Sequence, residues 1–195
     1  MPRLVPIPIL LLLMMQSFVA CDRAYTPKPS GYIRVDYPEK RYVLYDEQPG
    51  YRFEIPSYAK VESERIRGGA HPGWLNLEIP SLNGKVHLSY KPVDGNLNNL
   101  ITDCREMAYK HTVKADGIEE IPFINRENKQ FGMVYDLSGD VASAVQFFIT
   151  DSTTHFLRGS LYFYCPPNRD SLRPVIDFMR KDIMHLIETT EWKYE

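Results

Sequence analysis

The chain has 195 residues, a formal net charge of −2 at pH 7 and an apolar fraction of 44%. This length and composition suit one globular domain with a proper hydrophobic core. The near-zero charge argues against a nucleic-acid partner and against a strongly acidic one. Tyrosine and proline are abundant, with 13 and 15 copies, which favours a β-rich fold with many turns.

The N-terminal segment 1–20 has the pattern of a secretory leader that ends at a cysteine. Residues 4–15 are almost wholly apolar. The run is shorter than the roughly 20 apolar residues that a transmembrane helix needs, and it suits the h-region of a signal peptide. A released protein would show a small residue at −3, whereas Phe18 stands at −3 and Cys21 at +1. This pattern is typical of a bacterial lipobox, so the leader is predicted to be removed and Cys21 to be acylated; an ordinary signal peptide with an incidental cysteine is the alternative.

A tether is expected between the lipid and the folded part of the chain. Residues 21–31 contain two prolines, a glycine and polar residues, which favour an extended chain that buries little. Each buried CH₂ of an acyl chain contributes about 0.8 kcal/mol, so several acyl chains hold a protein at a membrane without a transmembrane helix. The sequence therefore predicts a single domain over residues 32–195, attached to the membrane through Cys21.

Strands dominate the first half of this domain. Residues 51–55 alternate between apolar and polar side chains, as a half-buried strand does. Residues 74–79 and 85–90 alternate in the same way, and Asn83–Gly84 between them is the pair best suited to a tight hairpin turn. The glycine-rich segment 67–73 is expected to be a surface loop, with the cradling of an anion as its alternative role.

Two helices flank a run of strands in the second half. Residues 94–112 and 171–190 carry apolar side chains at steps of three and four, which predicts amphipathic helices. Pro174 falls in the first turn of the second helix, where its missing N–H is tolerated. Four strand-like runs joined by short polar links predict an antiparallel meander between the helices, over residues 117–125, 130–137, 141–149 and 155–165.

The order of these elements sets the fold class. The run 141–149 is apolar on both faces, so we expect it in the interior of the sheet. Strands beside covering helices make an α+β domain. The predicted fold is therefore an antiparallel meander covered by one or two amphipathic helices.

The usual sequence motifs of catalysis and metal binding are missing from the chain. It has no nucleophile elbow, phosphate-binding loop, dinucleotide fingerprint, H-E-x-x-H or C-x-x-C motif. Its five histidines stand singly, without the short spacing of metal ligands. We therefore predict no catalytic residue, no metal site and no cofactor.

Two polar clusters are weighed against this prediction. Asp151, Ser152 and His155 are close in sequence, which suggests a triad or a metal loop, but triads usually join distant segments and Asp-Ser-Thr is common turn chemistry. We interpret the segment as a hairpin turn. The second cluster lies in residues 110–120 and is interpreted as a helix end followed by the start of a strand; its polar residues are His111, Asp116, Glu119 and Glu120.

Two further cysteines, Cys104 and Cys165, remain once Cys21 is acylated. In an oxidising periplasm they could form a disulfide. The alternative is that each is a small buried hydrophobic side chain. The distance between their Cα atoms decides between the two, and it does not follow from the sequence.

Several segments together resemble the gliding-motility lipoprotein GldD family of the Bacteroidota. The similarity spans nearly the whole mature chain, in the same order. The segments are YTPKPSGYIRVDYP (25–38), KVHLSYKPV (85–93), AYKHTVKADGIEE (108–120), QFFITDSTTHFLRGSLYF (146–163) and DIMHLIETTEW (182–192).

The resemblance implies a lipid-anchored envelope protein needed for gliding over surfaces and for the type IX secretion machinery coupled to it. Its expected partners are other envelope proteins of that machinery. It implies no enzymatic activity, cofactor or catalytic residue, and the only functional position that it carries over is Cys21. We expect the domain to face the periplasm from the outer membrane, with the inner membrane as the alternative.

The residues themselves also favour a protein that works by contact. Tyrosine and arginine anchor protein interfaces, and the outward positions of the late strands supply Arg158, Tyr162 and Tyr164. We therefore expect an interaction surface there and no small-molecule substrate. The rival class is a periplasmic enzyme or small-ligand-binding lipoprotein, which a deep apolar pocket with convergent polar groups would favour.

Overall fold

The computed structural model describes residues 35–66 and 69–194, so the predicted leader and tether lie outside the described residues. The elements follow in the order β1 (Tyr42–Tyr45), β2 (Tyr51–Pro56), β3 (Lys60–Ile66), β4 (Gly69–Ile79), β5 (Gly84–Pro92), α2 (Leu97–Tyr109), β6 (Ala115–Asn125), β7 (Gln130–Gly139), β8 (Val145–Thr150), β9 (His155–Phe163), α3 (Arg169–Thr189) and β10 (Glu191–Trp192). One-turn 3-10 helices stand at Pro80–Leu82 and Lys110–Val113.

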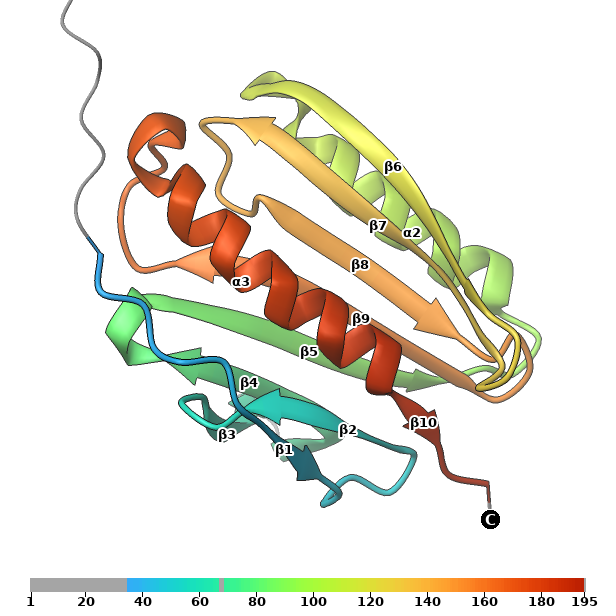
Figure 1. Ribbon diagram of the computed structural model, residues 1–195. Coiled ribbons are helices and arrows are strands. Elements are labelled where there is room, and N and C mark those ends of the chain that lie inside the picture. The colour runs from blue at the N-terminus through green and yellow to red at the C-terminus, as the bar shows by residue number, and fades with distance from the viewer. Residues whose placement is uncertain (1–34, 67–68, 195) are drawn as a thin grey trace, which may run out of the picture. The chain divides into compact units, whose positions relative to one another are not determined.

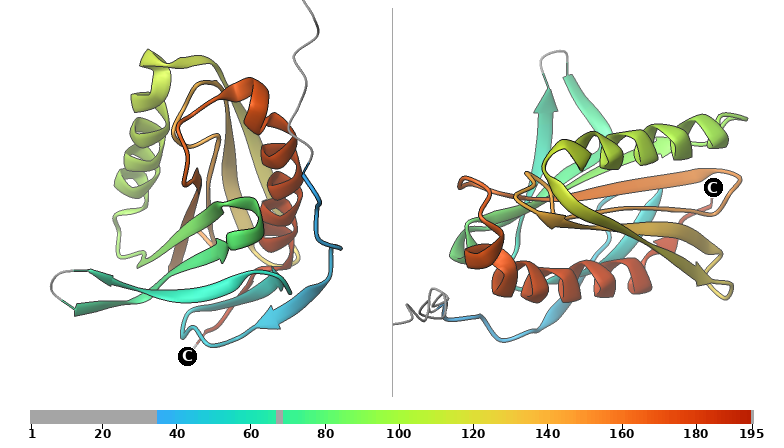
Figure 2. Two further views of the ribbon diagram at one scale, coloured as in Figure 1. Left: turned by 90° about the vertical axis from the view of Figure 1, so that its left-hand side faces the viewer. Right: turned by 90° about the horizontal axis from the view of Figure 1, so that it is seen from above.

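A seven-stranded antiparallel sheet forms the centre of the fold, in the order β3-β4-β5-β9-β8-β7-β6. Strands β6 to β9 are neighbours in chain order, so the predicted meander is confirmed. Figure 2 shows α2 and α3 on opposite faces of this sheet. The α+β prediction is confirmed, and each of the two predicted helices covers one face.

The face beneath α3 holds the larger hydrophobic core. Leu77 lies opposite Val86, and Val86 lies opposite Leu161, so a row of apolar side chains crosses three strands. At about 1.5–3 kcal/mol for each fully buried large apolar side chain, the facing helix stripe is the main reason that α3 docks here. The stripe consists of Val175, Met179, Ile183, Leu186 and Ile187, all buried.

The face beneath α2 holds a smaller core. Leu100, Cys104 and Ala108 stand four residues apart on α2 and are all buried. They pack in one cluster with Phe148 of β8 and Phe156 of β9, whose stacked rings have centroids 5.3 Å apart. The helix stripe predicted from the sequence is therefore the one that contacts the sheet.

A second, three-stranded sheet has the order β1-β2-β10 and lies in the lower part of Figure 1. Its strand β2 alternates so that Tyr51, Phe53 and Ile55 enter the core under α3. The segment before β1 is joined to α3 by a buried carboxylate, Asp182, which accepts hydrogen bonds from Lys40 Nζ and, at 2.9 Å, from Tyr42 Oη. The first described part of the domain is thus tied to its last helix.

The β4–β5 hairpin is confirmed, but its turn differs from the expected one. Ile79 pairs with Gly84, so the loop between them is four residues long and contains the 3-10 turn. Asn83 takes the left-handed conformation, with φ of +51°. Gly84 is instead a strand residue, and a Cβ there would come within 3.0 Å of Met179 Sδ.

Three boundaries also differ from the sequence-based expectation. Residues 69–73 belong to β4 instead of a loop, and Gly69 and Ala70 at its start pair with Ile66 and Arg65 of β3. β8 begins at Val145, after a bend over residues 141–144. α3 begins at Arg169 because the Asn168 side chain caps it, accepting a 3.1 Å hydrogen bond from the Ser171 N–H.

The two remaining cysteines are both free thiols, so the disulfide alternative does not hold in this structure. Cys104 is buried in the core beneath α2, whereas Cys165 follows the end of β9 and is half-buried. A disulfide needs Cα atoms within about 7 Å. Cys104 fits the alternative of a small buried side chain, and its burial raises the pKa of the thiol to about 11.

Candidate interaction surface

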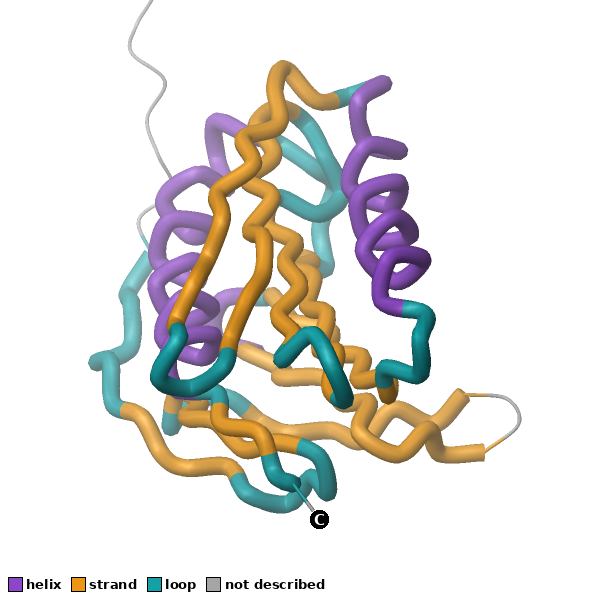
Figure 3. The backbone as a smooth tube through the Cα atoms, turned by 90° about the vertical axis from the view of Figure 1, so that its right-hand side faces the viewer, coloured by secondary structure: helices purple, strands orange, loops and turns teal. Residues whose placement is uncertain are grey.

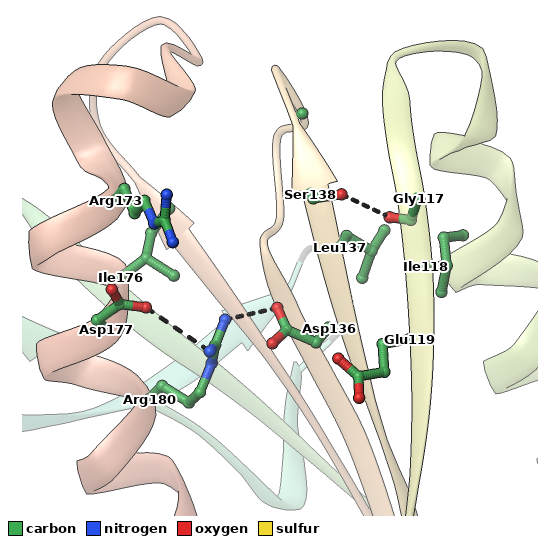
Figure 4. Close-up of a pocket in the computed structure, with 11 residues that line it drawn as sticks. Gly117, Ile118, Glu119, Asp136, Leu137, Ser138, Arg173, Ile176, Asp177 and Arg180 are labelled. Atoms are coloured by element: carbon green, nitrogen blue, oxygen red, sulfur yellow. Dashed lines mark hydrogen bonds and ion pairs between the residues drawn. The ribbon is translucent and has the colours of Figure 1, made fainter. Parts of the chain in front are cut away.

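A groove of about 380 Å³ lies between α3 and the ribbon of β6 and β7. Figure 4 shows Arg180 of α3 between Asp136 of β7 and Asp177 of its own helix. Arg180 Nη2 lies 2.6 Å from Asp136 Oδ1, and Nη1 lies 3.6 Å from Asp177 Oδ1. The charge of Arg180 is therefore taken up by two carboxylates of the groove itself.

The groove can hold a polar segment but offers no assembled nucleophile. Burial raises the pKa of Asp136, although Arg180 acts in the opposite direction. The Ser138 hydroxyl donates to the Gly117 carbonyl at 3.3 Å, and the lining contains neither histidine nor cysteine. A serine nucleophile needs an adjacent base, and the described lining does not place one beside Ser138.

A smaller cavity of about 160 Å³ lies on the opposite face of the sheet, between α2 and strands β4, β5 and β9. Its walls are formed by α2 and by β4, and Figures 2 and 3 show the β3–β4 hairpin projecting past the sheet on the same side as α2. Its lining mixes apolar and charged side chains. They are Trp74, His87, Ser89, Lys91, Leu100, Asp103, Cys104, Met107, Phe156 and Arg158.

Arg158 is the central charged group of this cavity. It is half-buried, and its Nη2 donates to Gln146 Oε1 at 3.2 Å and to Ser160 Oγ at 3.3 Å. Both partners are neutral, and within residues 35–66 and 69–194 no carboxylate forms an ion pair with Arg158. Beside it, His87 Nδ1 lies 2.9 Å from Asn76 Oδ1.

The three residues predicted for an interface, Arg158, Tyr162 and Tyr164, lie on this side of the sheet. Tyr162 is half-buried and opposite Lys85. Tyr164 is 56% exposed, donates to Glu78 Oε1 at 2.8 Å and lies under the Lys85 ammonium. We call the part of this side beyond α2 the open face; its half-buried or exposed side chains are Trp74, Asn76, Glu78, Lys85, His87, Tyr162 and Tyr164.

The segment with Asp151, Ser152 and His155 is a hairpin turn. Asp151 Oδ1 accepts from the backbone N–H groups of three residues, at 2.8–3.0 Å, one of which is His155. Burial alone would raise the pKa of Asp151, but these backbone hydrogen bonds outweigh it and lower the pKa. The carboxylate therefore binds the turn backbone instead of orienting the imidazole.

His155 belongs to an aromatic cluster. It is 4% exposed, its Nδ1 lies 2.7 Å from Tyr90 Oη, and its ring stacks on Trp192 with centroids 5.2 Å apart. Burial lowers the pKa of His155. Ser152 is exposed, with φ of +70°, and in the described part of the chain no hydrogen bond joins its hydroxyl to His155. The three side chains do not form a triad.

The polar residues of segment 110–120 do not converge either. His111 lies on the 3-10 turn after α2, and burial lowers its pKa. Glu120 accepts from Arg105 and Tyr109 of α2, whereas Glu119 lines the groove by α3, on the opposite face. Among the described residues, no three histidine, cysteine or acidic side chains gather as a metal site would require.

The comparison with protein families identifies the chain. A family model described as gliding motility lipoprotein GldD matches residues 22–192. The chain belongs to the GldD family. No curated protein matches the chain. Family membership makes the protein a lipid-anchored protein of the cell envelope with a role in gliding motility, and none of the described helices of this GldD-family member is both long and apolar enough to cross a membrane.

Sequence reasoning put Arg158 and the two tyrosines on the same side of the late strands, where the structure also has them, but it missed the cavity beside Arg158. Its other polar groups, Lys91 and Asp103, come from the end of β5 and from α2. The only sign of the cavity in the sequence is the alternation of the hairpin strands, which places Trp74 and His87 on its outward side. Their position beside Arg158 depends on the pairing of β5 with β9, a contact between residues about seventy positions apart.

Proposed function

We propose that this GldD-family protein is a non-catalytic interaction module, acylated at Cys21, that assembles envelope components of the gliding and type IX secretion machinery. The observation that supports the proposal most is the open face. It joins two tyrosines, a tryptophan and a neighbouring arginine on a sheet surface that α2 leaves uncovered. Aromatic residues and arginine are enriched at the centres of protein interfaces.

The polar clusters support the same proposal. Asp151 is occupied by turn N–H groups, and Arg180 by two carboxylates of the groove. Each arrangement stabilises the fold and leaves no base beside a nucleophile, which catalysis by covalent attack requires.

The matching family is described as a lipoprotein, which supports acylation, and Cys21 is the cysteine directly before the matched residues. A periplasm-facing position on the outer membrane is part of the proposal. Other motility and secretion proteins of the envelope are the proposed partners.

A photo-crosslinking amino acid at position 164 tests the proposal. In living cells it should crosslink to an envelope partner, because Tyr164 is the most exposed aromatic group of the open face. The same amino acid at position 188, an exposed site on α3, is the matched control and should give no such product.

Complementation gives a second test. Tyr162→Ala and Tyr164→Ala should reduce spreading on agar and type IX secretion while the protein accumulates normally. Ser152→Ala, which removes an exposed hydroxyl of the hairpin turn, should leave both intact. Full activity of both tyrosine variants, together with loss of motility in a stable His155→Ala protein, would defeat the proposal and favour an enzyme or ligand-binding role.

A further inference from the structure

The polar network around Arg158 has more hydrogen-bond donors than acceptors. A guanidinium carries five N–H groups, and Nη2 alone donates, to Gln146 and Ser160. Arg158 Nη1 and Nε have no acceptor within the described residues. Gln146 is 2% exposed, and its Nε2 is buried without a hydrogen-bond partner in the same part of the chain. Since buried polar groups are normally paired, Gln146 Nε2 lacks an acceptor. Arg158 is half-buried and lines the cavity, so its remaining N–H groups are available to a ligand there.

The charges of the cavity point to a single negative group. Arg158 and Lys91 contribute two positive charges and Asp103 one negative charge, which leaves one positive charge in excess. Neither cation forms an ion pair within the described ranges. A carboxylate is the monoanion that matches a guanidinium best, because the pair forms short, charge-assisted hydrogen bonds.

The rest of the lining limits the size and the polarity of the ligand. Leu100 and Phe156 are buried, and together with Met107 and Trp74 they provide an apolar wall. The volume of about 160 Å³ equals that of about five water molecules. This is smaller than the roughly 300–1,000 Å³ typical of cofactor and drug-sized sites. A carboxylate on a short apolar stem fits both the wall and the volume.

We infer that this cavity binds a carboxylate on a short apolar stem, paired with Arg158 and assisted by Lys91. The source that we infer for this carboxylate is an aspartate or glutamate side chain of a partner docked on the open face. This part of the inference rests on the proposed function. A free short-chain acid is the other source of the same chemistry.

Propionate is the probe for the carboxylate, and propionamide is its neutral isostere. The purified lipoprotein in detergent should bind propionate saturably in calorimetry, more weakly as salt is raised, and should not bind propionamide. Inorganic phosphate should bind less tightly than propionate. Equal binding of propionate and propionamide, or tighter binding of phosphate, would overturn the inference.

Variants that are expected to change the affinity for propionate in opposite directions test whether it binds in this cavity. Arg158→Gln should lower the affinity for propionate at least about tenfold, through the loss of a charge-assisted hydrogen bond. Lys91→Met should lower it about twofold to fivefold, and Asp103→Asn should raise it by a similar factor, since each changes one exposed charge. Arg126→Gln, at an exposed turn position outside the cavity, is the control.

Lys91 and Asp103 are exposed, so these two variants test the site even if Arg158→Gln unfolds. Unchanged affinity in both would refute the assignment of the cavity. Unchanged affinity in Arg126→Gln is expected.

Two blocked tripeptides, Ala-Glu-Ala and Ala-Gln-Ala, distinguish the sources of the carboxylate. Competition with propionate by the glutamate peptide alone supports a partner side chain, whereas propionate binding without peptide competition supports a free acid. A failure of this inference can be distinguished from a failure of the proposed function. Crosslinking from position 164 without propionate binding refutes this inference alone, and propionate binding with fully active tyrosine variants refutes only the docking role.

Discussion

Asp182 shows how one buried side chain can join distant parts of the chain. It is 4% exposed on α3 and accepts from Lys40, from Tyr42 and, at 2.5 Å, from Tyr58. Burial, followed by the bond to Asp182, raises the pKa of both tyrosines. Lys40 also lies over the ring of Phe178, one turn earlier on the helix. Removing one partner of such a buried ion pair is strongly destabilising, because the remaining charge is then uncompensated.

Asp182→Ala should therefore destabilise the domain by about 3 kcal/mol, because it leaves Lys40 half-buried without an anionic partner. Urea unfolding monitored by fluorescence measures this loss. Asp177→Ala is the matched control on the same helix. Its side chain is 52% exposed and 3.6 Å from Arg180, so its removal should cost less than about 1 kcal/mol. Equal losses in the two variants would show that the Asp182 cluster contributes little.

Asp151 gives a pH-dependent prediction at the residue scale. Its pKa in the folded protein is lowered by backbone hydrogen bonds that outweigh burial, so its ionised form stabilises the fold. This stabilisation is complete above the unfolded pKa of about 3.9 and is lost as the pH falls through the lower, folded pKa. Asp151→Asn should be less stable than the parent near neutral pH, and the difference should shrink as the pH falls below about 4.

Denaturant unfolding of Asp151→Asn and the parent across this pH range checks the prediction. Ser152→Ala changes the same turn without removing an ionisable group, so its effect should not depend on pH. A difference for Asp151→Asn that stayed constant down to strong acid would contradict the role of the carboxylate in the turn.

At the scale of elements, the sequence predicts what periodicity controls. The stripes of residues 94–112 and 171–190 identified both helices, and alternation identified the β4–β5 hairpin and the meander. Strand β3 was missed because KVESERI is mostly charged, with only Val61 and Ile66 apolar. It is a strand because it pairs with β4 at the edge of the sheet, where polar side chains are tolerated.

The sequence does not predict which helix covers which face of the sheet, for a related reason. An amphipathic stripe shows that a helix is buried on one side, but both faces of this sheet are apolar in the strands that the helices cover. Which face each helix covers depends on the long-range arrangement of the strands, of which the pairing of β5 with β9 is part. That pairing also creates the cavity at Arg158, and no local pattern encodes it.

Gly159 marks the closest approach of side chains to the middle strand, β9. A Cβ at this position would overlap the ring of Phe147 and would lie 3.0 Å from Leu88 Cδ2. Gly159→Ala should therefore destabilise the domain by about 1–3 kcal/mol, because Phe147 is 1% exposed and has no free space to move into. Thermal unfolding measures the change.

Gly117→Ala in β6 is the control for this prediction. Its Cβ would meet Ser138 Oγ at 3.4 Å, an ordinary contact, so the stability should change by less than about 0.5 kcal/mol. A Gly159→Ala domain as stable as the Gly117→Ala domain would mean that Phe147 can leave its position at little cost.

At the scale of the whole molecule, the start of the described chain and the open face lie on different sides of the sheet. The described chain begins at Val35, which packs against the larger core, and just after it Tyr37 stacks on Phe178 of α3 and Lys40 binds Asp182 of the same helix. The open face and the cavity lie on the α2 side. The first described segment is thus held against α3, on the side of the sheet opposite the open face.

Cys21→Ala tests the anchor on which this arrangement depends. The protein should lose labelling by a fatty-acid analogue and should no longer partition with membranes, because the thiol that takes the lipid is gone. The domain itself should unfold at the same temperature as the parent, since Cys21 lies outside the described fold. Cys165→Ala removes a free, half-buried thiol in the domain and should keep full labelling.

Spreading on agar should fail for Cys21→Ala at normal protein levels, because an unanchored domain diffuses away from the envelope complex. Continued labelling of Cys21→Ala would place the lipid elsewhere, and full spreading without labelling would show that the open face works without a membrane anchor.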